Sequence, residues 1–284
     1  MGAELETLDV AGISIAYLDE GQGPTVVLAH CSSGNHRMWS ALIRHLVTSH
    51  RVLAPDLIGY GQSGRWPEGR PYEADADVRV LGAVAGKADG AIYIVGHSYG
   101  AAMALEVARM LGERVRGMTL IEPVSFHLLQ AGACAAEARI IEDVSRRINA
   151  AMAVGDRRSA SAAYMGFWLG RFRWWLAPKK LKDPVIETVD KVAMEFAALE
   201  SQVASDLWPY RAIGAPTLLV YGEKTRAPAK AVVHILEKTL LHTRTVAVSG
   251  AGHMSPFTHR DQINALILDH IARVEHAARV TDAR

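Results

Sequence analysis

The sequence predicts a protein of the α/β class, with a mostly parallel central sheet flanked by helices. Short apolar segments rich in Val, Ile and Leu alternate along the chain with segments in which apolar residues recur at helical spacing. Continuous apolar runs of this kind are typical of strands that are buried on both faces of a parallel sheet. The length of 284 residues, 50% of them hydrophobic, suits one large domain that carries an insertion.

Seven short segments have the composition expected of strands, and helices are expected between and after them. The predicted strands are Ile13–Leu18, Thr25–His30, Arg51–Pro55, Ala91–Val95, Gly117–Ile121, Pro216–Tyr221 and Thr243–Val248. The predicted helices are Met38–Leu46, Ala101–Leu111, Ala227–Leu240 and Asp261–Glu275. The first strand is expected to run antiparallel, because a tight turn at Gly21–Pro24 leads into the second. Ligands of parallel sheets bind at the carboxyl ends of the strands, so each strand-to-helix junction is a candidate site.

The alternation is interrupted once, and the interrupting segment is predicted to be a helical cap inserted into the core. Apolar residues recur every four positions from Ile140 to Met152, which predicts an amphipathic helix. A second helix is expected to begin with Asp183 as its N-cap and Pro184 at its first position. The predicted limits are residues 125–210 for the cap and residues 1–124 and 211–284 for the core domain.

The run Gly96-His97-Ser98-Tyr99-Gly100 has the pattern G-x-S-x-G at a junction between a predicted strand and a predicted helix. A serine on a strained turn of this kind has an exposed hydroxyl. Glycines two residues away on either side let the strand and helix backbones approach closely. The turn also directs the amide of Tyr99 toward the reacting group. We therefore predict that Ser98 is a catalytic nucleophile.

A histidine in the loop after the last predicted strand is the candidate general base. His253 ends the glycine-containing run Ser249–His253, and it follows the serine in the chain order that accompanies such a turn. The ordinary pKa of histidine, near 6.5, allows the imidazole to accept the proton of Ser98 and to return it at neutral pH. The sequence therefore predicts a Ser98–His253 pair.

Two further loops carry a resemblance to a known family. The run His30–Gly34 is similar to the His-Gly loop of the α/β-hydrolase superfamily, and Ala54–Gly64, which reads APDLIGYGQSG, looks like its characteristic loop after the fourth strand. Together with the two motifs above, the resemblance extends from about Val26 to Ile271. It implies an α/β-hydrolase fold and an oxyanion hole formed by the backbone N–H groups of Ser32 and Tyr99.

The third member of the expected triad departs from the superfamily pattern. The superfamily usually places an aspartate in the loop after the strand Pro216–Tyr221, where this chain has Thr225, a residue without negative charge. The triad needs a carboxylate to orient His253 and to stabilise its imidazolium form. Some haloalkane dehalogenases, which share the fold, take their acid from the end of the preceding strand, where this chain has Glu122. We predict Glu122 as the acid, with Glu223, a catalytic dyad or another residue as the alternatives.

The type of nucleophile narrows the reaction class. Dehalogenases and epoxide hydrolases of this superfamily need an aspartate in the place of Ser98, so these activities are not expected. A serine with an oxyanion hole predicts hydrolysis of a carboxylic ester, a lactone or a thioester through an acyl-enzyme. Alternatives on the same residues are hydrolytic C–C cleavage, cofactor-free peroxidase chemistry and a ligand receptor with slow turnover. The expected reaction needs no metal and no organic cofactor.

The predicted cap is rich in aromatic residues, which either line an apolar pocket over Ser98 or pack the cap against the core. They are Tyr164, Phe167, Trp168, Phe172, Trp174 and Trp175. The basic residues among them either contact an anionic group of the substrate or form a solvated face. As residues in contact with substrate we select Phe126, Phe167, Trp168 and Met254. The expected partner is a small, apolar, ester-like molecule, bound by a monomer or a homodimer.

The composition argues against several kinds of partner and location. The chain has 31 Lys and Arg against 30 Asp and Glu, so no overall charge attracts nucleic acid or an anionic membrane. The two cysteines, Cys31 and Cys134, form no metal-binding motif, which fits a reducing cytosol. Cys31, where relatives have glycine, is expected to be a small buried residue. The first residues do not resemble a signal peptide and no apolar run is long enough to span a membrane, so we expect a cytoplasmic protein.

Overall fold

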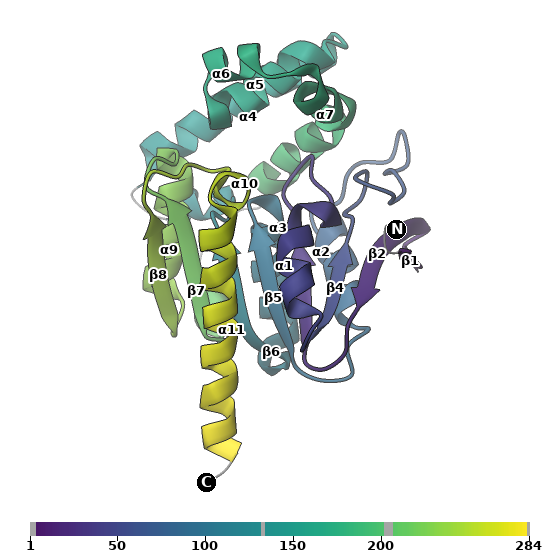
Figure 1. Ribbon diagram of the computed structural model, residues 1–284. Coiled ribbons are helices and arrows are strands. Elements are labelled where there is room, and N and C mark those ends of the chain that lie inside the picture. The colour runs from purple at the N-terminus through teal and green to yellow at the C-terminus, as the bar shows by residue number, and fades with distance from the viewer. Residues whose placement is uncertain (1–3, 132–133, 202–206, 283–284) are drawn as a thin grey trace.

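The computed structural model describes residues 4–131, 134–201 and 207–282. It contains a twisted sheet with helices on both faces and a further layer of helices above the sheet (Figure 1). Residues 132–133 and 202–206, which belong to the predicted cap, lie outside the described residues. The predicted α/β class with a mostly parallel sheet is confirmed.

Within the described residues the sheet has eight strands, in the order β1-β2-β4-β3-β5-β6-β7-β8. They are β1 (Glu6–Val10), β2 (Ile13–Glu20), β3 (Thr25–Ala29), β4 (Arg51–Pro55), β5 (Ile92–His97), β6 (Val115–Ile121), β7 (Thr217–Gly222) and β8 (Thr243–Val248). Strands β3 to β8 are parallel, and β1 and β2 are antiparallel to their neighbours. The predicted antiparallel strand is therefore confirmed as β2, although it pairs with β4 and not with the strand that follows it. The apolar pattern does not predict β1, an edge strand whose residues are mostly exposed.

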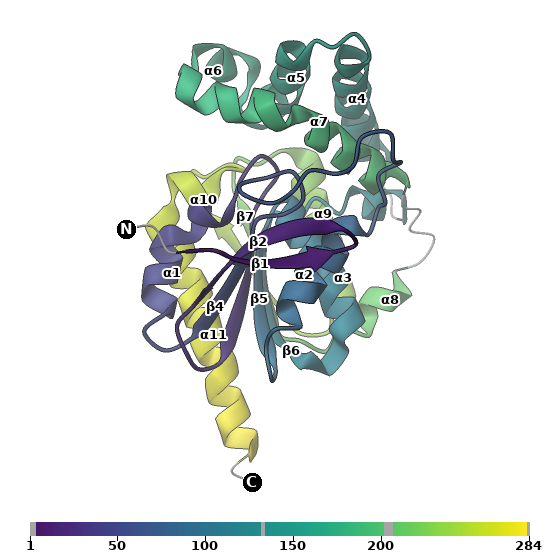
Figure 2. The ribbon, with the colours of Figure 1, turned by 90° about the vertical axis from the view of Figure 1, so that its right-hand side faces the viewer.

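Helices cover both faces of the sheet, and each face has its own buried core. Residues of α2, α3 and α9 pack on one face and residues of α1 and α11 pack on the other (Figures 1 and 2). Among the described helices, none is both long enough and apolar enough to cross a membrane. The helices of the core are η1 (His36–Trp39), α1 (Ser40–Leu46), α2 (Ala76–Ala85), α3 (Tyr99–Leu111), η2 (Gly112–Arg114), α8 (Trp208–Arg211), α9 (Ala227–Thr239), α10 (Ser255–Thr258) and α11 (Arg260–Asp282).

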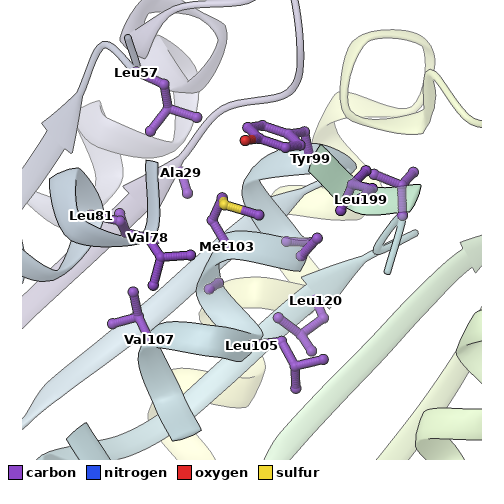
Figure 3. Close-up of a cluster of buried hydrophobic side chains, with 14 of the residues drawn as sticks. Ala29, Leu57, Val78, Leu81, Tyr99, Met103, Leu105, Val107, Leu120 and Leu199 are labelled. Carbon is purple, nitrogen blue, oxygen red and sulfur yellow. The ribbon is translucent and has the colours of Figure 1, made fainter. Parts of the chain in front are cut away.

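Helix α3 follows the sharp turn after β5, and its sequence explains its close packing on the sheet. Several of its buried residues are small, which lets the helix lie close to the strands: Ala101, Ala102, Ala104 and Ala108. Met103 and Val107 of α3 belong, with Val78 and Leu81 of α2, to the buried cluster in Figure 3. Burying each of these larger side chains stabilises the fold by roughly 1.5–3 kcal/mol. The helix stops at Gly112, where φ is 54°, a conformation that favours glycine.

A layer of helices lies over the carboxyl ends of the parallel strands, and we call helices α4 to α7 the cap (Figures 1 and 2). The segment contains η3 (Phe126–Ala131), α4 (Ala135–Ala153), α5 (Arg157–Leu169), α6 (Arg171–Leu176) and α7 (Lys179–Ser201). The predicted apolar face of helix α4 is present in part, because Val144 and Ile148 are buried and Met152 is partly buried. Ile140, its first predicted member, is exposed, and the neighbouring Ile141 is buried in its place. The limits of the cap as a domain stay a prediction.

The predicted start of the second cap helix at Pro184, with Asp183 as its N-cap, is wrong. Helix α7 begins at Lys179, and Pro184 lies inside it. Proline has no N–H to donate to the carbonyl of Lys180, but both residues are exposed, so water can replace the missing hydrogen bond. The predicted apolar face of this helix is present, since its members are buried: Val185, Val189, Val192 and Phe196.

Candidate active site

Ser98 lies on a sharp turn between β5 and α3. Its backbone has φ 56° and ψ −117°, which is strained for a residue with a Cβ atom. At both flanking glycines, a side chain would clash with the neighbouring backbone. A Cβ on Gly96 would lie 2.5 Å from Cα of Ala101, and a Cβ on Gly100 would lie 2.4 Å from the carbonyl oxygen of Ala29. The close approach of β3, β5 and α3 therefore fixes the strained turn that presents the Ser98 hydroxyl.

The side chains of Ser98, His253 and Glu122 form one hydrogen-bonded chain. Nε2 of His253 lies 2.9 Å from Oγ of Ser98, and Nδ1 of His253 lies 2.6 Å from Oε2 of Glu122. The three residues follow or end β5, β8 and β6, and all three are buried. A Cβ on Gly222 would lie 2.6 Å from the backbone of Ala251, so the loop that carries His253 packs directly on the end of β7. The structure thus brings together the three residues that the sequence selects, in the order that activates a serine.

The surroundings of Glu122 keep its carboxyl group ionised. Its Oε1 accepts a hydrogen bond from the N–H of Gly222 at 2.8 Å, and its Oε2 accepts from the hydroxyl of Thr225 in addition to His253. Burial alone would raise the pKa of Glu122, but His253 and these hydrogen bonds outweigh burial, and the pKa is lowered. Thr225, at the position where an aspartate is expected, therefore holds the carboxylate that replaces it.

The alternative acid, Glu223, has a different role in the structure. It is exposed, and its carboxylate accepts hydrogen bonds from the N–H of Gly250 at 3.0 Å and from the hydroxyl of Ser249 at 3.1 Å. These two hydrogen bonds lower the pKa of Glu223. Its carboxylate thus stabilises the loop that leads to His253, while Glu122 contacts the imidazole itself.

His97 supports the base from behind, a role that the sequence pattern does not indicate. Its Nε2 donates a hydrogen bond to the backbone carbonyl oxygen of His253 at 2.9 Å. Burial and the neighbouring charge of His253 lower the pKa of His97 to about 3, so its ring is neutral at physiological pH. His97 occupies a variable position of G-x-S-x-G, where the motif itself carries no signal for it.

The two residues predicted to form the oxyanion hole both line the pocket over Ser98. Tyr99 is the first residue of α3, where a backbone N–H has no acceptor within the helix and where negative charge is stabilised. Ser32 lies in the turn after β3. The neighbouring Cys31 is buried as expected, and burial raises the pKa of its thiol to about 12, so the thiol is unreactive near neutral pH.

The pocket over Ser98 lies between the core and the cap and is small. Its free volume is about 10 Å³, enough for roughly one water molecule. Phe126 and Trp168, two of the residues selected for substrate contact, line this pocket. Phe167 instead lines a larger cavity of about 660 Å³ between α4 and α5, and Met254 is the half-buried N-cap residue of α10.

Trp168 closes the pocket against the base. Its indole ring stacks on the imidazole of His253, with ring centroids 3.4 Å apart and an angle of 13° between the planes. An aromatic face in this position stabilises an imidazolium cation. Tyr164 also lines the pocket, whereas Phe172 and Trp175 are each 70% exposed. Some aromatic residues of the cap therefore line the pocket, and others face the solvent. A molecule larger than water does not fit into the free volume of this pocket.

A buried ionic cluster, which we define as Lys191, Asp77 and Glu195, joins the cap to the core beside this pocket. Nζ of Lys191 donates to Asp77 at 2.7 Å and to Glu195 at 2.8 Å. Glu195 also accepts hydrogen bonds from the hydroxyl groups of Tyr60 at 2.8 Å and Ser32 at 2.5 Å. The three charged side chains are at most 5% exposed. The sequence gives one indication of this cluster: Lys191 and Glu195 lie one helical turn apart on the apolar face of α7.

Comparison with known proteins supports the same fold. The sequence profile of the alpha/beta hydrolase family matches residues 26–266. Lipase LipV of Mycobacterium tuberculosis is 36% identical over 103 residues, which are 36% of this chain and 38% of that protein. A haloalkane dehalogenase of Mesorhizobium japonicum is 34% identical over 111 residues, which are 38% of this chain and 35% of that protein. The chain therefore matches these curated relatives over well under half of their length.

A solved structure extends the likeness to nearly the whole chain. The enol-lactonase from Burkholderia xenovorans LB400 aligns with a TM-score of 0.72 and covers 94% of this chain and 100% of that chain. The sequence identity is 20%, so this likeness concerns the fold.

Proposed function

The chain belongs to the alpha/beta hydrolase family, and from that premise we propose that it is a serine hydrolase that cleaves a carboxylic ester, a lactone or a thioester. The observation that carries the proposal is the continuous hydrogen-bonded chain from Ser98 through His253 to Glu122, with distances of 2.9 and 2.6 Å. The similarity to a lipase supports the choice of an ester-type bond. The similarity to a haloalkane dehalogenase does not extend to its reaction, because Ser98 lacks the carboxylate that such a nucleophile needs.

In the proposed mechanism, Ser98 is the nucleophile, His253 transfers protons and Glu122 stabilises the charged form of His253. Nε2 of His253 accepts the proton of Ser98 as Oγ attacks the carbonyl carbon, and Glu122 stabilises the imidazolium that forms. The imidazolium then donates this proton to the leaving group, and an acyl-enzyme remains on Ser98. A water molecule, deprotonated by His253, attacks the acyl-enzyme, and the proton returns to Oγ of Ser98 as the acid is released.

The oxyanion that forms in both steps is stabilised by the N–H groups of Ser32 and Tyr99. Loss of one such donor typically costs about 3 to 4 kcal/mol of transition-state stabilisation. The indole of Trp168 covers the imidazole face and excludes water from the charged intermediate, which strengthens these interactions.

The proposal is tested by following 4-nitrophenol release from 4-nitrophenyl acetate and butyrate in the wild type, Ser98→Ala and Ser249→Ala. The wild type and the control at the exposed Ser249 are expected to show a burst followed by steady turnover, and Ser98→Ala is expected to show neither. Intact mass after treatment with a sulfonyl fluoride is expected to show one adduct, absent from Ser98→Ala. Wild-type rates in Ser98→Ala would overturn the mechanism, and an adduct without turnover would favour the receptor interpretation.

A further inference from the structure

The pocket over Ser98 is apolar along most of its wall, and a buried carboxyl group stands at one edge. Val124, Phe126 and Leu199 contribute apolar surface to the wall. Glu195 of α7 lines the same pocket beside Ser32, and its side chain is only 2% exposed. The catalytic steps described above use Ser32 through its backbone and do not use Glu195 at all.

Among the described residues, the donors bonded to Glu195 leave one of its acceptor positions open. A carboxylate has about four lone-pair positions. Oε1 accepts from Lys191 and from Tyr60, both at 2.8 Å, and Oε2 accepts from Ser32 at 2.5 Å. The remaining position therefore belongs to Oε2, the oxygen that is bonded to a residue of the pocket wall.

The charge of the ionic cluster favours a hydrogen-bond donor at that position. Lys191 brings one positive charge to two carboxyl groups, Asp77 and Glu195. Burial, together with the negative charge of Asp77, raises the pKa of Glu195 in spite of Lys191. A buried carboxyl group that is incompletely compensated is stabilised by a donor and destabilised by another acceptor or an anion.

We propose that Glu195 is a specificity-determining residue that accepts a hydrogen bond from a hydroxyl group on the acyl part of the substrate. Ser32 sets the position of this hydroxyl, because in the proposed mechanism its N–H binds the oxyanion and because its own hydroxyl is bonded to Glu195. The substrate is therefore a hydroxyacyl ester whose hydroxyl lies within a few bonds of the carbonyl carbon. This inference rests on the proposed function. It changes the expected substrate from an ester with a purely apolar acyl group to an ester whose acyl group carries a hydroxyl.

The first test compares 4-nitrophenyl butyrate, 4-nitrophenyl 3-hydroxybutyrate and the mono-4-nitrophenyl ester of succinic acid. The acyl groups of these substrates carry no polar group, a hydroxyl and a carboxylate, respectively, while the leaving group is the same. After correction for their rates of alkaline hydrolysis, the wild type is expected to favour the hydroxy ester over butyrate by about tenfold or more in kcat/KM, since a site built for a hydroxyl rejects the analogue that lacks it. The anionic succinate ester is expected to be the poorest substrate. Equal values for the first two esters would overturn the proposal while leaving the proposed function intact.

The second test assigns the preference to Glu195. Glu195→Gln keeps the shape of the side chain but removes its charge, and it is expected to abolish the preference for the hydroxy ester over butyrate, mainly through KM. Glu187→Gln, at an exposed position of the same helix, is expected to keep the wild-type preference. Loss of activity on both esters alike in a folded Glu195→Gln protein would show a structural role and overturn the proposal.

A third measurement separates this proposal from the proposed function. Binding of ethyl butyrate and ethyl 3-hydroxybutyrate to Ser98→Ala and to Ser98→Ala/Glu195→Gln is followed by calorimetry. Tighter binding of the hydroxy ester that depends on Glu195 would support the inference even if the wild type hydrolysed neither ester. Equal binding of both esters would overturn it.

Discussion

At the scale of single residues, the candidate triad takes its acid from the end of β6, and Thr225 stands where the superfamily pattern has an aspartate. Strands β6 and β7 are adjacent and parallel, so their carboxyl ends meet at the same edge of the sheet. A carboxylate from either strand end can therefore approach Nδ1 of His253. Glu122, one methylene longer than aspartate, makes this contact at 2.6 Å, and Thr225 on the neighbouring loop donates a hydrogen bond to the same carboxylate.

Replacement of Glu122 by Gln tests this assignment. The amide keeps the size of the side chain but cannot stabilise the imidazolium form of His253, so kcat for 4-nitrophenyl butyrate is expected to fall roughly a thousandfold or more with little change in KM. Steady-state kinetics at pH 7 provide the measurement. Glu223→Gln is the matched control, because this exposed carboxylate only stabilises the loop that precedes His253. A large loss in Glu223→Gln together with an active Glu122→Gln protein would move the acid to Glu223.

At the scale of secondary-structure elements, the end of α5 closes the pocket. Helix α5 stops before Gly170, where φ is 90°, and Nε of Arg226, the residue before α9, donates to the carbonyl oxygen of Phe167 at 2.5 Å. These features fix the last turn of α5 against the core. The indole of Trp168 is thereby held 3.4 Å from the ring of His253.

Replacement of Trp168 by Ala is expected to open the pocket. Removal of a buried indole typically costs about 3 to 5 kcal/mol of unfolding free energy, and it enlarges the space over His253. The preference for 4-nitrophenyl octanoate over acetate, as a ratio of kcat/KM values, is therefore expected to rise about tenfold. Trp175→Ala is the control, because this side chain is 70% exposed. An unchanged preference in Trp168→Ala would mean that the indole does not limit the pocket.

At the scale of the whole molecule, the ionic cluster is one of the places where the cap holds the core. Lys191 comes from α7 of the cap and Asp77 from α2 of the core, and both are buried. Replacement of Lys191 by Met would leave Asp77 buried without its cation, and this typically costs about 3 to 5 kcal/mol. Urea unfolding at pH 7 measures the loss. Lys180→Met, at an exposed position of α7, is expected to change the unfolding free energy by less than about 0.5 kcal/mol.

The effect of Lys191→Met on stability is expected to depend on pH. Burial would raise the pKa of Asp77, but Lys191 and the hydrogen bonds outweigh burial, and the pKa of Asp77 is lowered below its ordinary value of 3.8. A carboxyl group whose pKa is lower in the folded state stabilises the fold above its ordinary pKa, and this stabilisation is lost as the pH falls through the folded value. In the variant, the unpaired Asp77 takes up a proton as the pH falls, which relieves its penalty. The difference in unfolding free energy between wild type and variant should therefore narrow from pH 7 to pH 4, and a constant difference would contradict this account.

Local sequence patterns were sufficient to predict most strands and helices of the core and two members of the candidate triad, Ser98 and His253. The G-x-S-x-G turn carries a steric requirement that is visible in the chain, because a Cβ on Gly96 or Gly100 would meet the neighbouring backbone. In the loop before His253, Gly250 has φ 71°, a conformation that favours glycine. The start of α7 could not be predicted in the same way, since Pro184 normally marks a first helical turn and is tolerated further inside only because this part of the helix is exposed.

Local patterns in the sequence were enough to predict the α/β class, the alternation of strands and helices, and the candidates Ser98 and His253, because periodicity and tight turns are properties of neighbouring residues. Glu122 was selected on the resemblance to the superfamily, from its place at the end of a predicted strand. Tertiary structure alone decided which residues surround them. The stacking of Trp168 on His253, the support of Glu122 by Thr225 and the meeting of Lys191 with Asp77 all join segments far apart in the chain. Such contacts depend on how the cap and the strand ends come together in space, and local sequence patterns carry no record of them.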